Sequence, residues 1–102
     1  VEDLVQAIVA AVRADVGGEV FQIATHRETT VVEIAQAIGQ IVREETGRAV
    51  QTMHAAANAG EVQRNFSDIS KARRLLGWQP RTRLEEGLRA TVDWFLANPA
   101  PR

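Results

Sequence analysis

The chain has 102 residues, no cysteine, and twelve basic against thirteen acidic side chains, which gives a formal net charge of −1. This length suits one modest core, and we expect a single domain over residues 1–97 with a frayed tail at 98–102. The missing cysteines exclude a disulfide scaffold, a thiolate zinc site and a cysteine nucleophile. Because the charges are interleaved and no apolar run reaches membrane-spanning length, we predict a soluble, cytoplasmic protein that binds neither nucleic acid nor membrane.

Apolar residues recur at helical spacing from residue 4 to residue 12 and predict a first helix that ends near Asp15. Asp3 stands where an N-cap side chain accepts backbone amide hydrogens. The expected buried face consists of Leu4, Val5, Ile8, Val9 and Val12. Residues 19–24, EVFQIA, follow a glycine pair, alternate along the chain and are typical of a short β-strand.

A second helix is predicted to begin at Thr30, because Thr30 and Glu33 have the spacing of a capping box, and to end at Gly47. Its apolar face consists of Ile34, Ala35, Ile38, Ile41 and Val42. The segment AVQTM at residues 49–53 predicts a second short strand. Residues 54–66 have no sustained period and are predicted to form a loop.

A short third helix is predicted between Asp68, which can cap its start, and Gly77, which can end it. Its apolar face consists of Ile69, Ala72, Leu75 and Leu76. A fourth helix is expected after Pro80, where Thr82 and Glu85 again have capping-box spacing. Its apolar stripe consists of Leu84, Leu88, Val92 and Phe95.

The indole of Trp78 lies at the corner between the third and fourth helices. A large ring at such a corner fills the wedge between converging apolar faces, so we expect it to pack in the core rather than stack on a ligand. Its expected neighbours are Leu75, Leu88 and Val92.

These elements predict an α/β fold, or a small α+β-like lobe, in the order helix, strand, helix, strand, helix, helix. The central strand, helix and strand can form a parallel pair through a right-handed crossover. A parallel two-stranded sheet is a poor structure alone, so we expect the fold to be incomplete without a partner domain or a partner chain.

The sequence contains no complete catalytic or metal site. It lacks tyrosine and any glycine-rich phosphate loop, so no cofactor site is predicted. His26 and His54 are loop residues without partners at metal-ligand spacing. Ser67 and Ser70 have no nearby histidine and stand at a helix start, where hydroxyls cap backbone amides.

A helix-turn-helix DNA-binding module is an alternative for residues 29–48, which have a capped start and a glycine at position 39. A recognition helix would need a break at Gly39 followed by a basic, polar helix. The residues that follow instead continue the apolar period and add two acids, so DNA binding is the least favoured hypothesis.

Five segments occur in an order that resembles one family along essentially the whole chain: VEDLVQAI, EVFQIAT with ETTVVEIAQAI, GEV, DISKARRLLGWQP and LEEGLRATVDWF. The chain is similar to the C-terminal lobe of the extended short-chain dehydrogenase/reductases, the NAD-dependent epimerases and dehydratases that include UDP-glucose 4-epimerase. In that family an N-terminal domain carries the NAD-binding loop and the catalytic Tyr-Lys pair, whereas the C-terminal lobe binds the nucleotide sugar.

The resemblance implies substrate contacts in an R-x-G-[DE] stretch, which here is Asn58, Ala59, Gly60 and Glu61. Glu61 keeps the acid that accepts ribose hydroxyl protons. Asn58 replaces the arginine and cannot offer a charged fork to a diphosphate, so Arg64 is considered as a substitute. His26 stands where the family usually has glycine after the strand.

Two functions of different classes therefore stand beside the DNA-binding hypothesis. The first is the UDP-sugar-binding lobe of an epimerase or dehydratase. The resemblance implies that NAD binds to another domain of the parent family. The UDP-sugar is expected to bind to this chain weakly, or only together with the dinucleotide-binding domain. On this hypothesis the chain alone is catalytically incomplete. The second is a non-enzymatic α/β domain that acts through protein contacts. A lobe without its partner domain leaves an apolar face unburied, so we also expect a homo-oligomer.

Overall fold

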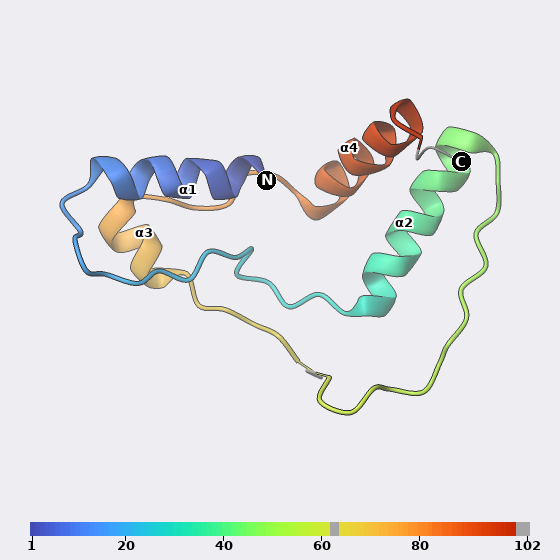
Figure 1. The fold of residues 1–102 in the computed structure, drawn as a ribbon, viewed down its shortest axis with the longest axis horizontal. Coiled ribbons are helices and arrows are strands. Elements are labelled where there is room, and N and C mark those ends of the chain that lie inside the picture. Colours follow the sequence, from blue (N-terminus) through green and yellow to red (C-terminus); the bar gives the residue numbers. More distant parts are fainter. Residues whose placement is uncertain (62–63, 100–102) are drawn as a thin grey trace. The chain divides into compact units, whose positions relative to one another are not determined.

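The computed structural model describes residues 1–61 and 64–99, and in these ranges the chain forms four helices and no β-strand (Figure 1). The helices are α1 (Glu2–Arg13), α2 (Val31–Thr46), α3 (Ser70–Leu76) and α4 (Leu84–Ala97). None of them, among the described residues, is long and apolar enough to cross a membrane.

The chain divides into two compact units. The first consists of Val1–Glu28 and Arg64–Thr82 and contains α1 and α3. The second consists of Thr29–Gln63 and Arg83–Arg102 and contains α2 and α4. The predicted single domain over residues 1–97 stays a prediction, and residues 100–102 of the predicted tail lie outside the described part of the chain.

The predicted α/β fold with a two-stranded parallel sheet is wrong, because the described residues are helical or irregular. All four predicted helices are confirmed, and the two predicted strands are not formed. A strand needs a second strand to pair its backbone N–H and C=O groups. Residues 19–24 lie in the first unit and residues 49–53 in the second, so neither segment has the other as its neighbour within a unit.

Residues 19–24 nevertheless keep the alternation from which a strand was predicted. Phe21 and Ile23 are half-buried against the core of the first unit, whereas Val20 and Gln22 are exposed. The segment runs past α3 (Figure 1), and the ammonium group of Lys71 on α3 lies 5.3 Å from the centre of the Phe21 ring. Side-chain packing on helices therefore replaces a backbone ladder here.

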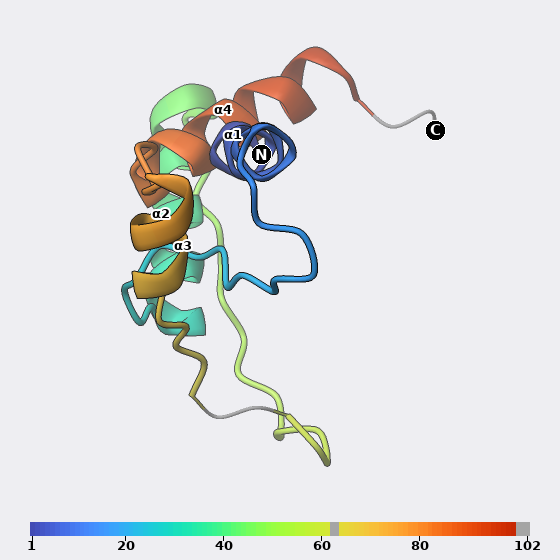
Figure 2. The ribbon, with the colours of Figure 1, turned by 90° about the vertical axis from the view of Figure 1, so that its left-hand side faces the viewer.

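The core of the first unit is built around Trp78. Its indole is 6% exposed and clusters with Ala7 of α1 and with Ile69 and Ala72, which are fully buried. Figure 2 views α1 end-on with α3 beside it. The predicted core role of Trp78 is confirmed, but none of its predicted neighbours belongs to the cluster. Leu75 is 40% exposed, and Leu88 and Val92 belong to the second unit.

Asp3 joins the start of α1 to the segment that leads into α4. Its backbone carbonyl accepts a 2.8 Å hydrogen bond from the indole Nε1 of Trp78. Its carboxylate accepts backbone hydrogen bonds from Arg81 at 3.1 Å and from Thr82 at 2.9 Å. Asp3 is therefore not the N-cap of α1 as predicted, because α1 begins at Glu2 with Val1 as its N-cap.

The apolar face predicted for the first helix is not the face that packs in the first unit. Ala7 is the buried residue of α1, while Leu4, Ile8 and Val12 are 51%, 56% and 81% exposed. Small alanine side chains allow the close approach of α3, and the bulky side chains of the helix lie on its solvent side.

The second unit consists of α2 and α4, which pack against each other. The predicted capping box is confirmed: the Glu33 amide donates to Thr30 Oγ1 at 3.1 Å, and the Thr30 amide donates to Glu33 Oε2 at 2.7 Å. The helix ends as predicted at Gly47, whose φ is 70°. Arg89 of α4 joins the helices by ion pairs with Glu44 at 2.6 Å and Glu45 at 2.7 Å.

The start of α4 is displaced by one residue from its prediction. The helix begins at Leu84, its N-cap is Arg83, and the Arg83 amide donates to Glu86 Oε2 at 3.1 Å. The Thr82 amide donates to Asp3 Oδ2 at 2.9 Å and not to Glu85, as a capping box at Thr82 would require.

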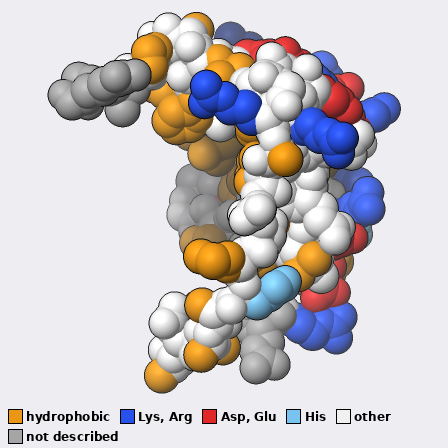
Figure 3. All heavy atoms as spheres, turned by 90° about the vertical axis from the view of Figure 1, so that its right-hand side faces the viewer, with side chains coloured by type: hydrophobic (Ala, Val, Ile, Leu, Met, Phe, Trp, Pro, Cys, Tyr) orange, Lys and Arg blue, Asp and Glu red, His pale blue; other side chains and the backbone are white. Residues whose placement is uncertain are grey.

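Several large hydrophobic side chains are exposed in each of the two units. Hydrophobic side chains reach the surface in several places on the face drawn in Figure 3. Exposed examples from the second unit are Val31, Val50, Met53 and Phe95.

We predict that Trp78→Ala lowers the free energy of unfolding by about 3–5 kcal/mol, because it removes the largest side chain of a small core. The matched control is Trp94→Ala, since Trp94 is 59% exposed. Urea unfolding followed by circular dichroism measures both variants. An equal loss for the two tryptophans would contradict the assigned core.

Asp3→Asn is expected to cost about 1 kcal/mol at neutral pH, comparable to the loss of a helix cap. The pKa of Asp3 lies below its ordinary value of 3.8, chiefly because the Thr82 amide donates to the carboxylate. A lowered folded-state pKa contributes stability above the unfolded-state pKa and loses it as pH falls through the folded-state value. The difference between wild type and variant in urea titrations should therefore shrink as the pH falls below about 4 and disappear once the pH lies below the folded-state pKa. A difference that persists there would contradict the role of the charge.

Candidate functional site

Two of the three predicted substrate-binding residues lie in one tight turn. The Glu61 amide donates to the Asn58 carbonyl at 3.2 Å, which closes the turn over residues 58–61. Gly60, in its third position, has a φ of 89°, which favours glycine. The amide Nδ2 of Asn58 also donates to Glu61 Oε1 at 2.8 Å. The sequence therefore brings Asn58 and Glu61 together locally.

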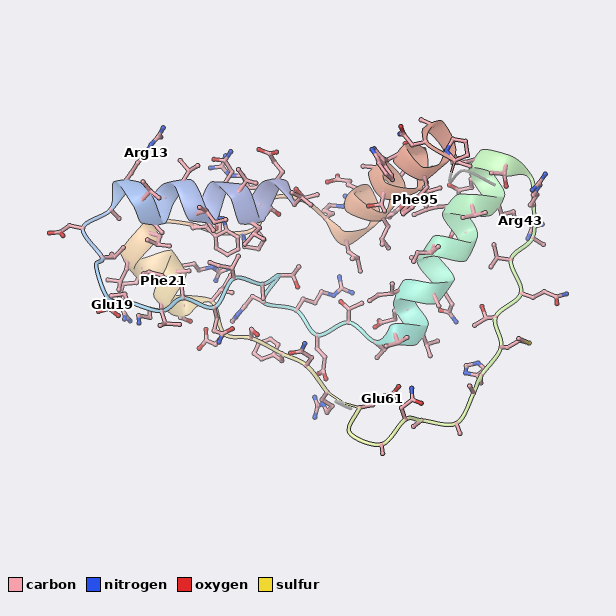
Figure 4. The ribbon with its side chains drawn as sticks, viewed as in Figure 1. Arg13, Glu19, Phe21, Arg43, Glu61 and Phe95 are labelled. Carbon is pink, nitrogen blue, oxygen red and sulfur yellow. The ribbon has the colours of Figure 1, made fainter. Side chains whose placement is uncertain are left out.

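The turn presents both side chains to solvent. Figure 4 shows Glu61 on the long loop that follows α2. One carboxylate oxygen of Glu61 accepts the Asn58 amide, which leaves the second oxygen with capacity for further donors. Asn58 fixes the carboxylate without neutralising it, because an amide carries no net charge. The pair is suited to accept hydroxyl protons of a polar ligand.

The third predicted residue, Arg64, belongs to the first unit and is already paired. Its Nε and one terminal nitrogen donate to Glu28 at 2.8 and 2.7 Å, the geometry of a bidentate pair. The hydrogen bond lowers the pKa of Glu28 and raises the pKa of the Arg64 guanidinium. The Arg64 side chain is nevertheless 82% exposed, so this pair holds the guanidinium weakly.

The Arg64–Glu28 pair is one of several contacts between residues 19–28 and residues 64–71. His26 stacks on Phe66 with ring centres 5.3 Å apart, and Lys71 forms a 2.6 Å ion pair with Glu19. As the residue number falls from 28 to 19 in the first segment, the number of its partner rises from 64 to 71 in the second. The two segments therefore run antiparallel. Side chains, and not a β-ladder, join the segments in the described residues.

His26 combines two unusual features. Its φ is 57°, in the left-handed region that is strained for residues other than glycine. Its Nδ1 atom is buried, has no hydrogen-bond partner among the described residues, and lies 3.9 Å from Asp68 Oδ1. The residue thus occupies a glycine-like conformation at the position where the family resemblance leads one to expect glycine.

Asp68 and Ser70 form the start of α3 rather than a reactive pair. The Ser70 amide and hydroxyl both donate to Asp68 Oδ1, at 2.8 and 2.5 Å, and these hydrogen bonds lower the pKa of Asp68. The prediction that Asp68 caps α3 is wrong in its position, because the N-cap is Ile69, which makes no side-chain cap hydrogen bond. The Ser70 hydroxyl donates to Asp68 and does not cap a backbone amide. His54 is exposed on its loop, and no group of three or more metal-binding side chains occurs in the described ranges.

Sequence reasoning missed Glu28 as the partner of Arg64. The two residues are separated by 36 positions, and no local pattern links them.

The helix-turn-helix alternative is removed by α2, which continues from Val31 to Thr46 through Gly39 without a break.

A family model of GDP-mannose 4,6 dehydratase matches residues 1–91. The chain is 34% identical over 102 residues to a dTDP-glucose 4,6-dehydratase of Shigella flexneri, covering 96% of this chain and 28% of that protein. It is 35% identical over 95 residues to a UDP-glucose 4-epimerase of Mycolicibacterium smegmatis, covering 93% and 29%. A crystal structure of UDP-glucose 4-epimerase from Thermotoga maritima with UDP-glucose matches with a TM-score of 0.79 at 35% identity, covering 94% and 29%.

These similarities define the chain as a C-terminal region of the extended short-chain dehydrogenase/reductases, as the sequence motifs predicted. The chain belongs to the GDP-mannose 4,6 dehydratase family. It spans less than a third of the length of these relatives.

The φ of His26 yields a test of its glycine-like position. His26→Gly and His26→Ala both remove the ring, but only alanine keeps a Cβ atom that is strained at positive φ. We expect the glycine variant to be more stable than the alanine variant by about 1 kcal/mol, measured by urea unfolding. Gln22→Gly and Gln22→Ala are the control pair at an exposed position, and there the alanine variant should be the more stable one. Equal stability of the two His26 variants would contradict the left-handed conformation.

Proposed function

We propose that the chain is the nucleotide-sugar-binding lobe of an epimerase or dehydratase and that Glu61 binds the ribose of the nucleotide. The observation that carries the proposal is the turn over residues 58–61, which holds a solvent-exposed carboxylate beside an amide in a chain of this family. The matched crystal structure, described as containing UDP-glucose, supports the same ligand class.

Glu61 suits a ribose because a carboxylate accepts hydrogen bonds only. Two neighbouring hydroxyl groups can donate to it together, and the Asn58 amide holds one of its oxygens in place. Discrimination at this turn would therefore depend on the sugar hydroxyls, and a ribonucleotide should bind more tightly than its 2′-deoxy analogue.

Asn58 makes a weak partner for the diphosphate. A guanidinium would offer charged, bidentate hydrogen bonds, whereas the side-chain amide offers neutral ones that are roughly half as strong. Arg64, the predicted substitute, already donates two hydrogen bonds to Glu28. We therefore propose weak binding by this chain alone, which the dinucleotide-binding part of the family would strengthen.

On the same proposal, hydride transfer takes place in the dinucleotide-binding part of the family. The chain has no tyrosine to take the role of the family's catalytic acid or base, and no glycine-rich loop for a dinucleotide. NAD would be held outside these 102 residues, and the contribution of this lobe would be to bind and orient the nucleotide sugar.

A protein-interaction domain is the second candidate function, and the exposed apolar side of α1 is the observation that favours it. The two functions do not exclude each other, because one uses the turn at residues 58–61 and the other a helix of the first unit.

Isothermal titration of the chain with UDP-glucose tests nucleotide-sugar binding. We expect measurable binding that Glu61→Ala abolishes and that Asn58→Arg strengthens, since arginine restores the charged fork. Replacing UDP-glucose by its analogue with a 2′-deoxyribose should weaken binding about three- to tenfold, the effect of one net hydrogen bond.

Gln51→Ala is the matched control, because it removes an exposed polar side chain of the same loop outside the turn. The proposal is wrong if wild type and Asn58→Arg both fail to bind, or if Glu61→Ala binds as well as the control.

A further inference from the structure

The turn over residues 58–61 carries a negative charge that no basic group of the turn offsets. Glu61 supplies the carboxylate, and its partner within the turn is the neutral side-chain amide of Asn58 at 2.8 Å. Among the described residues of the second unit, no basic side chain forms an ion pair with Glu61. The carboxylate therefore keeps its charge toward a ligand, and it accepts hydrogen bonds without donating any.

The unit that carries the turn is itself acidic. Residues 29–61 and 83–99, its described part, contain seven acidic and four basic side chains, which gives a net charge of −3 with His54 neutral. Two of the four basic residues, Arg83 and Arg89, already lie within ion-pair distance of carboxylates on α4 and α2. The charges of this unit therefore disfavour an anionic ligand.

Arg64 does not supply the missing positive charge. It follows Glu61 closely in the sequence, but it belongs to the first unit, where its guanidinium donates two hydrogen bonds to Glu28. The pair as a whole carries no net charge, so it offers a diphosphate no net attraction. The positive charge that usually binds phosphate is therefore absent from the turn and neutralised at Arg64.

We propose that the turn recognises ribose as an uncharged pair of hydroxyl groups and selects against phosphate. The inference rests on the proposed function and narrows its ligand class. Glu61 accepts the two hydroxyl hydrogens, whereas the phosphates of the same nucleotide lie within about one Debye length, ~8 Å at physiological salt, and are repelled. A nucleoside is therefore a better ligand of this turn than its diphosphate, and affinity for phosphate comes from residues outside the turn.

Titration of the isotope-labelled chain with uridine and with uridine diphosphate, followed by the amide shifts of Gly60 and Glu61 in a phosphate-free buffer, tests the inference. At about 0.01 M salt we expect uridine to bind the wild type about two- to fivefold more tightly than the diphosphate. Raising the salt to about 0.15 M should shrink this difference, because screening weakens the repulsion, and should leave the uridine affinity unchanged. A phosphate site built on a cation would instead lose diphosphate affinity as salt is added.

Asn58→Arg and Gln51→Arg form a matched pair of variants, because each adds one positive charge to the same loop at an exposed position. Asn58→Arg places the charge in the turn and should raise the ratio of diphosphate to uridine affinity about three- to tenfold at about 0.15 M salt. Gln51→Arg places it outside the turn and should change that ratio by less than about twofold. The wild-type comparison stands without either variant.

Tighter binding of the diphosphate than of uridine to the wild type at low salt would overturn the inference and leave the proposed function standing. An equal change of the ratio in the two arginine variants would also overturn it, because the phosphate would then not lie beside the turn. If neither ligand binds to the wild type or to Asn58→Arg, or if Glu61→Ala binds uridine as well as the wild type does, the proposed function itself is wrong, and this inference with it.

Discussion

The first unit depends on the double contact between Asp3 and the residues that follow α3. The Asp3 carbonyl holds the Trp78 indole, and the Asp3 carboxylate holds the backbone of Arg81 and Thr82. One residue at the start of α1 thereby fixes both the core indole and the chain that enters α4. The side of α1 that carries Ala7 packs inward, and Leu4, Ile8 and Val12 are exposed.

The helices could be predicted from the sequence because their signals are local. The capping box of Thr30 and Glu33 and the left-handed glycines at positions 47 and 77 act within a few residues, and all three appear in the structure. The prediction of a sheet failed because a strand forms only beside a second strand, which a local pattern does not reveal. Residues 19–24 instead pack their side chains against the core of the first unit and against Lys71 of α3. The family likeness therefore predicted the membership of the chain correctly, and the local sequence patterns predicted its secondary structure only in part.

The same distinction applies to the candidate site and to the faces of the helices. Asn58 and Glu61 meet because a four-residue turn brings them together, so their pairing is accessible from the sequence. The pairing of Arg64 with Glu28 joins segments far apart and was not foreseen. The periodicity of α1 identifies its apolar side, but not whether that side meets this unit or another partner. The side of α1 that packs in the first unit is shown by the cluster of Ala7 with Ile69, Ala72 and Trp78.

The central claim is that Glu61 and its turn bind the ribose of a nucleotide sugar. Titration of isotope-labelled chain with UDP-glucose, followed by backbone amide NMR shifts, tests it most directly, because each residue reports separately. The account predicts that the largest saturable shifts occur at the Gly60 and Glu61 amides, while the amides of α1 stay unchanged. Saturable shifts confined to other segments, or none at any concentration, would contradict it.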